Sequence, residues 1–161
     1  LLLLRCYYKD MKTIEVFEGK GKICEDILRS LPSWFNDEES LMTWVVDVEK
    51  SLFFATYDGD RPIAFISLKE HFPETYEIDI MAVYSEYHRR GIGKELLEFS
   101  GPVLKKLGVK FLQVKTISES REDIPYDKTR AFYLRSGFTP IEEFKELWGE
   151  EYPCLLLIKA L

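Results

Sequence analysis

The chain has few cysteines, with three in 161 residues: Cys6, Cys24 and Cys154. They lie far apart and form neither a Cys-x-x-Cys pair nor a His/Cys ligand spacing, so the sequence supports no disulfide framework and no metal site. Buried, reduced thiols are the expected state, as in cytoplasmic proteins. We therefore expect a cytoplasmic location.

The chain also lacks long apolar runs and an excess of positive charge. The "LLLL" at residues 1–4 is far too short to span a bilayer, and no small-residue cleavage site follows it. The net charge of −6 argues against nucleic-acid binding, which needs a basic surface. It is compatible with a cationic substrate, although acidity can equally serve solubility. We expect neither nucleic acid nor a membrane as a partner.

Linkers rich in proline, glycine or serine and internal repeats are absent too. Hydrophobic residues make up 46% and charged residues 31%, as is ordinary for a globular protein, and the length suits one domain. Met11 opens a stretch, "MKTIEVF", that resembles a natural start. We expect residues 1–10 to be a disordered or non-native extension and residues 11–161 to form a single domain.

Strands are predicted along the whole chain. Alternating or continuous apolar residues indicate strands at 13–17, 51–57, 62–71, 76–84, 110–116, 138–144 and 154–161. The second and third of these form a hairpin, because the Asp-Gly of "DGDR" supplies its turn.

Two helices are predicted near the start of the chain. Residues 21–31 and 36–50 repeat apolar side chains at helical spacing. Asn36 or Asp37 would cap the second of them, and Pro32 separates the two.

Two further helices are predicted in the second half. Residues 91–107 keep helical spacing, but the Gly-Pro pair at 101–102 should kink or break this helix, since proline removes a donor and clashes with the preceding turn. Residues 126–137 would form a helix capped by Asp127 and ended by Gly137. The resulting order, β-α-α-β-β-β-α-β-α-β-β, predicts an α/β fold with a mixed sheet.

The stretch "HRRGIGKELL", residues 88–97, lies between the central predicted strand and the third helix. The first N–H groups of a helix lack intrahelical partners and favour an anion such as a pyrophosphate, which glycine lets the backbone approach. Arg89, Arg90 and Lys94 would add positive charge. On spacing alone, a tight turn that only packs the helix fits equally well. The glycine spacing matches neither a Walker loop nor a Rossmann turn.

Together with its surroundings, this stretch resembles the GNAT superfamily of acyl-CoA-dependent N-acetyltransferases. The turn of that family reads Q/R-x-x-G-x-G/A, and residues 88–93 read His-Arg-Arg-Gly-Ile-Gly, with His88 in place of Gln or Arg. A second family element, a helix with Tyr followed by Gly-Phe, is matched by "RAFYLRSGF" at 130–138. The resemblance covers residues 13–159 and implies a central mixed, mostly antiparallel sheet flanked by helices.

The resemblance also implies a site for acetyl-CoA as the acetyl donor. The pyrophosphate would rest on the N–H groups of the glycine turn, which consists of His88, Arg89, Arg90, Gly91, Ile92, Gly93 and Lys94. The pantetheine arm would run along the end of the preceding strand, at Met81, Ala82 and Val83. One backbone N–H of that strand would polarise the thioester carbonyl, as in an oxyanion hole.

Acetyl transfer to an amine requires the substrate ammonium to lose a proton and the CoA thiolate to gain one. The resemblance implies Tyr133 as the general acid, since a phenol is protonated at neutral pH. An aromatic pair such as Phe132-Tyr133 on a helix can also be plain core. Many family members have an asparagine that contacts the cofactor seven residues before this tyrosine, and here that position is Tyr126.

The general base is the role that the sequence determines least. Some relatives place a glutamate on the strand after the glycine-turn helix, where this chain has Gln113. Glu77 and Asp79, on one face of the central strand, and Glu119, in a loop, are the candidates, each acting through a water. Solvated carboxylates without a catalytic role fit the same pattern, and solvent can remove the proton without a dedicated base.

The acceptor in this family is held by the early helices and the later strand pair. Here these regions, 31–39 and 146–153, combine aromatic and acidic residues. Trp34, Phe35 and Trp148 could hold a cationic amine by cation–π contacts, or could be packing residues. The expected acceptor is a small-molecule or peptide amine: a small amine, an amino acid, a polyamine, an aminoglycoside-like compound, a protein N-terminus or a lysine.

The sequence thus predicts an N-acetyltransferase that moves an acetyl group from acetyl-CoA to a primary amine by direct attack in a ternary complex. The alternatives are a non-catalytic acyl-CoA-binding or regulatory domain of the same fold, and a nucleotide-phosphate binder. Retention of Tyr133 favours the enzyme, whereas the missing Gln/Arg, Asn and Glu favour the non-catalytic domain. A monomer or a homodimer is expected, and the apolar last strand could support a dimer.

Overall fold

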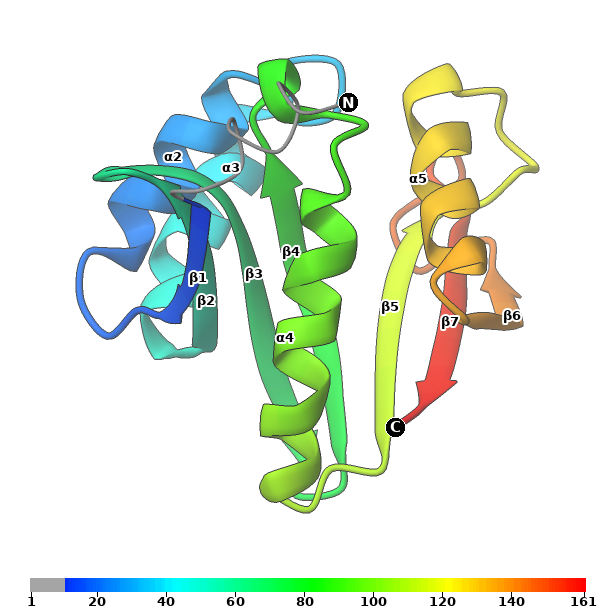
Figure 1. Cartoon of the computed structure of the whole chain (residues 1–161). Helices are drawn as coiled ribbons and strands as arrows, with labels where there is room; N and C mark the ends of the chain where they lie inside the picture. The colour runs from blue at the N-terminus through cyan, green and yellow to red at the C-terminus, as the bar shows by residue number, and fades with distance from the viewer. Residues whose placement is uncertain (1–10) are drawn as a thin grey trace, which may run out of the picture. The chain divides into compact units, whose positions relative to one another are not determined.

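The computed structural model of the chain describes residues 11–161 (Figure 1). The extension expected at residues 1–10 lies outside the described residues. In chain order, the elements are the strand β1 (Met11–Glu15), the helices α2 (Lys20–Arg29) and α3 (Glu38–Asp47), the short 3-10 helix η1 (Val48–Lys50), the strands β2 (Leu52–Asp58), β3 (Arg61–Phe72) and β4 (Thr75–Val83), the 3-10 helix η2 (Ser85–Tyr87), α4 (Ile92–Lys106), β5 (Phe111–Ile117), α5 (Ile124–Arg135), β6 (Thr139–Phe144) and β7 (Cys154–Ala160). The predicted order of strands and helices is confirmed.

The strands belong to one sheet with the order β1-β2-β3-β4-β5-β7-β6. β1 pairs with β2, β5 with β7 and β6 with β7 in antiparallel orientation, whereas β4 and β5 run parallel. A parallel pair needs a crossover connection, and α4 is the helix in the chain between these two strands. The predicted mixed sheet, flanked by helices, is confirmed.

The chain divides into two compact units. The first unit comprises the residues up to Ser67 together with Ile80–Ser100, and the second comprises Leu68–Asp79 together with Gly101–Leu161. β3, β4 and α4 each contribute one part to either unit. The expectation of a single domain over residues 11–161 stays a prediction.

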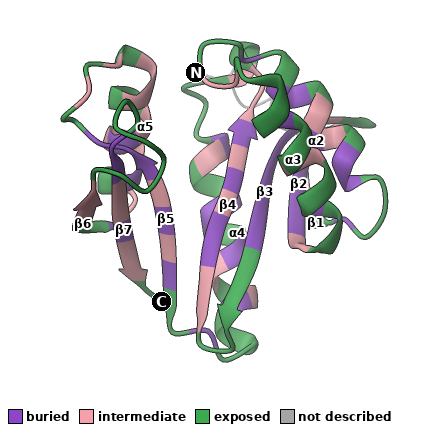
Figure 2. Ribbon diagram, turned by 180° about the vertical axis from the view of Figure 1, so that it is seen from behind, coloured by how far each residue is buried: buried purple, intermediate pink, exposed green. Residues whose placement is uncertain are grey.

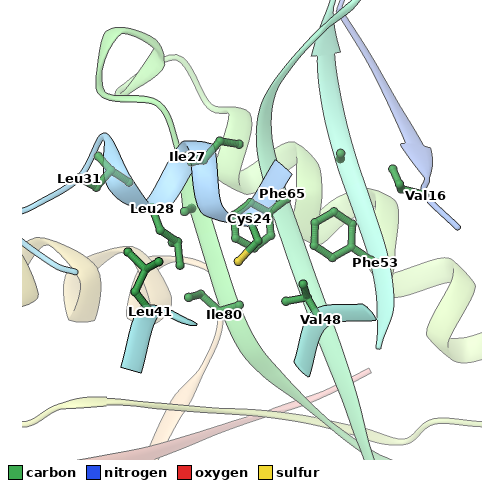
Figure 3. Close-up of a cluster of buried hydrophobic side chains, with 12 residues drawn as sticks. Val16, Cys24, Ile27, Leu28, Leu31, Leu41, Val48, Phe53, Phe65 and Ile80 are labelled. Carbon is green, nitrogen blue, oxygen red and sulfur yellow. The ribbon is translucent and has the colours of Figure 1, made fainter. Parts of the chain in front are cut away.

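Apolar side chains of α2, α3 and the strands form a core in the first unit (Figure 3). Leu28 of α2 and Phe53 of β2 are both fully buried in it, and the Phe53 ring stacks on Phe65 of β3 with 5.1 Å between centroids. The next residue of β2, Phe54, instead meets Phe99 of α4 at 5.3 Å. Because successive side chains of a strand point to opposite faces, β2 can pack against helices on both sides.

The central strand β3 carries a continuous run of buried residues, which fits burial on both faces. β3 is buried from Ile63 to Leu68 and exposed from Lys69 to Phe72 (Figure 2). A strand with one solvated face would alternate instead, so the run agrees with the central place of β3 in the sheet.

In the second unit, α5 packs on β5, and β5 and β7 supply much of the buried surface. Val114 and Leu157 are register partners on these strands, and both are almost fully buried. Tyr133 of α5 packs against the ring of Phe138 at 5.4 Å. The predicted acid is therefore packed against the residue that leads from α5 into β6.

The predicted break in the third helix is wrong. α4 continues from Ile92 through Gly101 and Pro102 to Lys106. Pro102 and Glu98 are both exposed, so the carbonyl of Glu98, which loses its helical donor to the proline, lies on the side where water can satisfy it. None of the described helices, α4 included, is long and apolar enough to cross a membrane.

Of the two N-terminal helix caps that were predicted, the cap of α3 is confirmed and the cap of α5 is wrong. Of the two candidates before α3, Asp37 is the cap, because its carboxylate accepts from the Ser40 N–H at 2.8 Å. The predicted cap of α5, Asp127, is wrong: Asp123 caps the helix, accepting from the Tyr126 N–H at 3.2 Å. The helix starts earlier than predicted, because Pro125 is tolerated in a first turn.

Replacing Leu28 by alanine should destabilise the protein by about 2–5 kcal/mol, because a fully buried side chain leaves a cavity in the core. Urea unfolding at neutral pH measures the change. Leu107→Ala is the matched control, since Leu107 is 56% exposed and should cost well under about 1 kcal/mol. Equal losses for the two variants would contradict the placement of Leu28 in the core.

Candidate functional site

The turn between β4 and α4 is built from unusual backbone conformations. Arg89 has a φ of 60° and Gly91 a φ of 80°, both in the left-handed region. Glycine adopts this region freely, whereas arginine rarely does. An added Cβ at Gly91 would meet no atom within 4 Å, so the backbone angle, and not crowding, is what this position requires of glycine.

The start of α4 presents unpaired donors beside positive side chains. The N–H of Glu95 donates to the carbonyl of Gly91 at 3.0 Å, so the N–H groups of residues 92–94 precede the first helical bond of this type. Arg89, Arg90 and Lys94 are exposed around them. Backbone donors, the helix dipole and three cations together suit a phosphate or pyrophosphate, so the residues present fit the predicted donor's anionic group.

His88, the departure from the family turn, contacts the end of β4. Its Nε2 lies 2.7 Å from the carbonyl oxygen of Val83, and because a carbonyl only accepts, Nε2 donates. The imidazole also meets the ring of Trp34 edge-on, with 5.9 Å between centroids. The structure thus brings together a predicted turn residue, a predicted pantetheine residue and a predicted acceptor residue within the first unit.

The end of β4, predicted to hold the pantetheine arm, extends past the β4–β5 pairing. The register described for these strands runs from Thr75–Phe111 to Ile78–Val114. Met81 and Val83 are half-buried and Ala82 is buried. This register ends before Met81, Ala82 and Val83, so the backbone groups of these three residues are candidates for pairing with an extended ligand.

Tyr126 and Tyr133 lie seven residues, or two turns, apart on α5 in the second unit, and therefore on one face of the helix. Burial raises the pKa of both phenols, most strongly that of Tyr133, which is 5% exposed. Tyr133 also packs against Phe132 and Phe138. Its phenol therefore stays protonated well into the alkaline range, as a proton donor must.

Glu77 is a buried carboxylate on β4, with 7% of the residue exposed. It accepts from Lys115 Nζ at 2.9 Å to each oxygen, from Gln113 Nε2 at 3.1 Å, and from His71 Nε2. Burial alone would raise its pKa, but the three donors together outweigh burial and lower the pKa below its usual value. These contacts give Glu77 a structural task in the second unit and make it a weak base.

The other two base candidates have different surroundings. Asp79 is half-buried on β4, and Glu119 is exposed in the loop after β5. Both are assigned to the second unit, and their catalytic role stays a prediction.

The predicted acceptor residues do not form one described group. Trp34 and Phe35 belong to the first unit, where they are half-buried against the core, and Phe35 meets Trp44 edge-on at 5.7 Å. Trp148 belongs to the second unit and is 42% exposed in the loop between β6 and β7. Packing explains Trp34 and Phe35 as well as substrate binding does.

The cysteines within residues 11–161, Cys24 and Cys154, are buried, and neither forms a disulfide bond. Burial raises the pKa of the Cys154 thiol to about 11, so it is protonated and unreactive at neutral pH. Cys6 lies outside the described residues.

Sequence reasoning missed the donors around Glu77, namely His71, Gln113 and Lys115. The available signal was the presence of polar residues inside otherwise apolar strands: Gln113 and Lys115 alternate with the buried residues of β5. Polar groups at such positions are expected to need partners, because burying them unpaired is costly.

Glu77→Gln should lower the free energy of unfolding at pH 7 by about 1–3 kcal/mol, because the buried Lys115 contact loses its charge. The folded-state pKa of Glu77 is lowered, so its contribution is present above the unfolded pKa near ~4.3 and is lost as pH falls through the folded value. Urea unfolding between pH 7 and 3 should therefore show the difference from wild type shrinking at the acid end.

The matched control is Glu74→Gln, since Glu74 forms an exposed pair with Lys110 and should cost little. A Glu77→Gln variant as stable as the wild type at pH 7 would contradict the buried network.

Comparison with known proteins bears on the family. No curated protein sequence matches the chain. A family model described as "Acetyltransferase (GNAT) domain" matches residues 49–140, which is more than half of the chain.

Solved structures of similar fold cover nearly the whole chain. A proposed acetyltransferase of the GNAT family from Desulfovibrio desulfuricans has 16% identity and a TM-score of 0.79, covering 93% of this chain and 98% of that one. An aminoglycoside 6′-N-acetyltransferase complexed with coenzyme A has 15% identity and a TM-score of 0.75, covering 92% and 96%. A GNAT family acetyltransferase from Elizabethkingia anophelis with acetyl-CoA bound has 19% identity and a TM-score of 0.70, covering 95% and 99%.

At these identities the solved structures establish the fold, and the family match establishes the membership that the glycine turn and the tyrosine helix suggested. The chain belongs to the family of GNAT acetyltransferase domains.

Proposed function

We propose that the chain is an N-acetyltransferase that transfers an acetyl group from acetyl-CoA to a primary amine by direct attack in a ternary complex. The observation that carries the proposal is the turn at residues 88–94, where left-handed backbone, the N-terminus of α4 and three cations form a site suited to pyrophosphate. Family membership supports it, as do the structural neighbours solved with coenzyme A and acetyl-CoA.

In this proposal the backbone N–H groups of residues 89–94 bind the donor's pyrophosphate. Arg89, Arg90 and Lys94 contribute charge from exposed positions, where each contact is individually weak. His88 is directed to Val83, so it shapes the turn instead of adding a phosphate contact.

The edge of β4 at Met81, Ala82 and Val83 is proposed to hold the pantetheine arm. Backbone groups there lie beyond the described β4–β5 register and can pair with an extended chain. A backbone N–H directed at the thioester oxygen would stabilise the negative charge that develops when the amine attacks.

Tyr133 is the proposed general acid. The neutral amine forms a bond to the acetyl carbon, the carbon–sulfur bond breaks, and the phenol of Tyr133 gives its proton to the departing sulfur. The nitrogen loses its excess proton to water and the Tyr133 phenolate regains a proton from water, which leaves the amide, free CoA and neutral Tyr133. The raised pKa keeps this phenol protonated at neutral pH. Tyr126, on the same face of α5, is proposed as a cofactor contact in place of the family's asparagine.

The substrate ammonium, with a pKa near ~10, must lose a proton before it attacks. Glu77 has the wrong properties for this step, because a base works best with a pKa near the working pH and Glu77's is lowered by its donors. Asp79 or Glu119 through a water, or solvent alone, are the remaining routes.

The proposed acceptor is a cationic small-molecule or peptide amine. Trp34 and Phe35 in the first unit, and Trp148 in the second, are each a candidate for a cation–π contact with such a group, and one structural neighbour is an aminoglycoside acetyltransferase. The acidic net charge of −6 would favour the approach of a cation.

Calorimetric titration with CoA and a thiol-release assay with acetyl-CoA and a panel of amines test the proposal together. CoA binding with turnover of at least one amine is expected. CoA binding without turnover of any amine would favour the non-catalytic acyl-CoA-binding domain, to which the engagement of Glu77 in ion pairs also points. Tighter binding of ATP than of CoA would contradict the proposal that acetyl-CoA is the acetyl donor.

Gly91→Val should weaken CoA binding at least about tenfold, because a β-branched residue at a φ of 80° strains the turn. Calorimetry measures the affinity. Gly108→Val is the matched control: Gly108 has a φ of 86° and equally open surroundings, so it should lose similar stability without losing CoA affinity. Normal CoA affinity in Gly91→Val would refute the placement of the pyrophosphate.

Tyr133→Phe should lower kcat by about 10²–10⁴-fold with little change in the KM for acetyl-CoA, because only the proton donor is removed. The pH profile supplies a second readout. Since burial raises the pKa of Tyr133 above its usual value of ~10, kcat of the wild type should show no loss attributable to this acid below about pH 10. An unchanged kcat in Tyr133→Phe would refute the assignment.

A further inference from the structure

The glycine turn contains a residue that local preference does not support. Arg89 sits at a φ of 60°, and a non-glycine residue in the left-handed region persists only where the surrounding structure holds it. The segment from Tyr84 to Arg90 contains no long helix or strand of its own that could supply this hold. Within the segment, backbone bonds from the N–H of Tyr87 to Tyr84 and from the N–H of His88 to Ser85 hold a short turn, and contacts with neighbouring elements of the first unit add to this restraint.

The hairpin between β2 and β3 provides contacts of this kind. Tyr87 Oη donates to Asp58 Oδ2 at 2.7 Å, and the guanidinium of Arg61 lies over the ring of Tyr84 at 4.4 Å. Arg61 also pairs with Glu86 at 3.2 Å. Asp58 and Arg61 flank the two-residue loop of the hairpin, so a single feature of the fold contacts three residues before the turn, at positions 84, 86 and 87.

The contact between Tyr87 and Asp58 is the strongest of these. The Arg61–Glu86 pair is about half exposed on both sides, and exposed pairs contribute little. The Tyr87–Asp58 bond is partly buried and joins a phenol to a carboxylate, which is the charge-assisted class. In agreement with this, the carboxylate of Asp58 raises the pKa of Tyr87.

Tyr87 also lies directly against the cationic part of the turn. The guanidinium of Arg90 is 5.2 Å from the centre of its ring. One side chain therefore joins the hairpin, through its hydroxyl group, to a cation beside Gly91, through its ring. Neither Asp58 nor Tyr87 belongs to residues 88–94, so both act on a bound anion through the turn.

We propose that Asp58 and Tyr87 are positioning residues that hold the glycine turn in the conformation that binds the pyrophosphate of CoA. The inference rests on the proposed function, since it assumes that the turn is the CoA site. Without the bond, the turn would populate conformations in which the N–H groups of α4 no longer converge on an anion. The apparent Kd equals the intrinsic Kd divided by the fraction of molecules in the competent conformation, so it rises as that fraction falls.

A positioning role predicts a specific pattern of effects. Tyr87→Phe and Asp58→Ala should each weaken CoA binding about three- to tenfold, the size expected for one hydrogen bond. Asp58→Asn should lose less, because its amide oxygen can still accept from the phenol. The KM for acetyl-CoA should rise, while kcat at saturating donor and the KM for the amine stay unchanged.

The experiment is calorimetric titration of CoA into the full chain as wild type, Tyr87→Phe, Asp58→Ala, Asp58→Asn and the Tyr87→Phe/Asp58→Ala double variant. The double variant should bind no more weakly than the worse single variant, because both remove the same bond. Tyr76→Phe is the matched control: Tyr76 lies near the start of β4, whereas the turn follows the end of that strand, and its Oη donates to Glu70 at 2.9 Å in the second unit, so CoA affinity should be unchanged.

Amide hydrogen exchange at residues 88–94, measured without CoA, gives an independent readout. Faster exchange in Tyr87→Phe than in wild type or Tyr76→Phe is expected, with similar thermal midpoints for the three proteins.

The outcomes separate this inference from the function on which it rests. If the wild type binds CoA and both Tyr87→Phe and Asp58→Ala bind it equally tightly, the positioning roles are overturned. The proposed function is not affected by that result. Additive losses in the double variant, or an equal loss in Tyr76→Phe, also overturn the positioning roles. A wild-type chain that binds no CoA overturns the proposed function and this inference together.

Discussion

The backbone of the turn between β4 and α4 is the constraint on which the candidate site depends. The chain must pass from the end of a strand to the start of a helix within a few residues, and it does so with left-handed angles at Arg89 and Gly91. Glycine accepts that geometry and arginine resists it. The first N–H groups of α4 follow directly on these residues, so the direction in which they point depends on this backbone. The contacts of Tyr87 with Asp58 and of His88 with Val83 hold a conformation that the local sequence alone would not favour.

The cations of the turn and the carboxylate of Glu77 differ in their exposure to solvent, and this decides what their charge contributes. The cations of the turn are exposed, so their charge is available to a ligand and contributes little to folding. Glu77 is buried and accepts from three donors, so its charge stabilises the second unit, and its lowered pKa makes it a weak base. The result is the opposite at Tyr133: burial raises the pKa of the phenol, so the phenol stays protonated. Glu77 and Tyr133 thus differ in their proposed tasks because of their burial and their hydrogen-bond partners, more than because of their residue type.

The fold was largely predictable from periodicity. The order of strands and helices follows from apolar residues at spacings of two or of three and four, which depend on residues close together in the chain. The two errors arose where a local rule met a different environment. Gly101 and Pro102 were expected to break α4, yet Pro102 faces solvent and the helix continues. Asp127 was expected to cap α5, but Asp123 precedes a proline that fits the first turn, so the helix begins there.

By itself the sequence determined the order of the elements, the position of the glycine turn and the tyrosine helix, and through them the family. Each of these rests on motifs of fewer than about twenty residues, whose conformation follows from local spacing. Only the tertiary structure decided which side chains restrain the turn and which carboxylate is structural. Tyr87 and Asp58 are 29 residues apart, and Lys115 and Glu77 are 38 apart. Such pairs meet because the sheet brings distant strands and loops together, and no local pattern in the sequence records which partners will face each other.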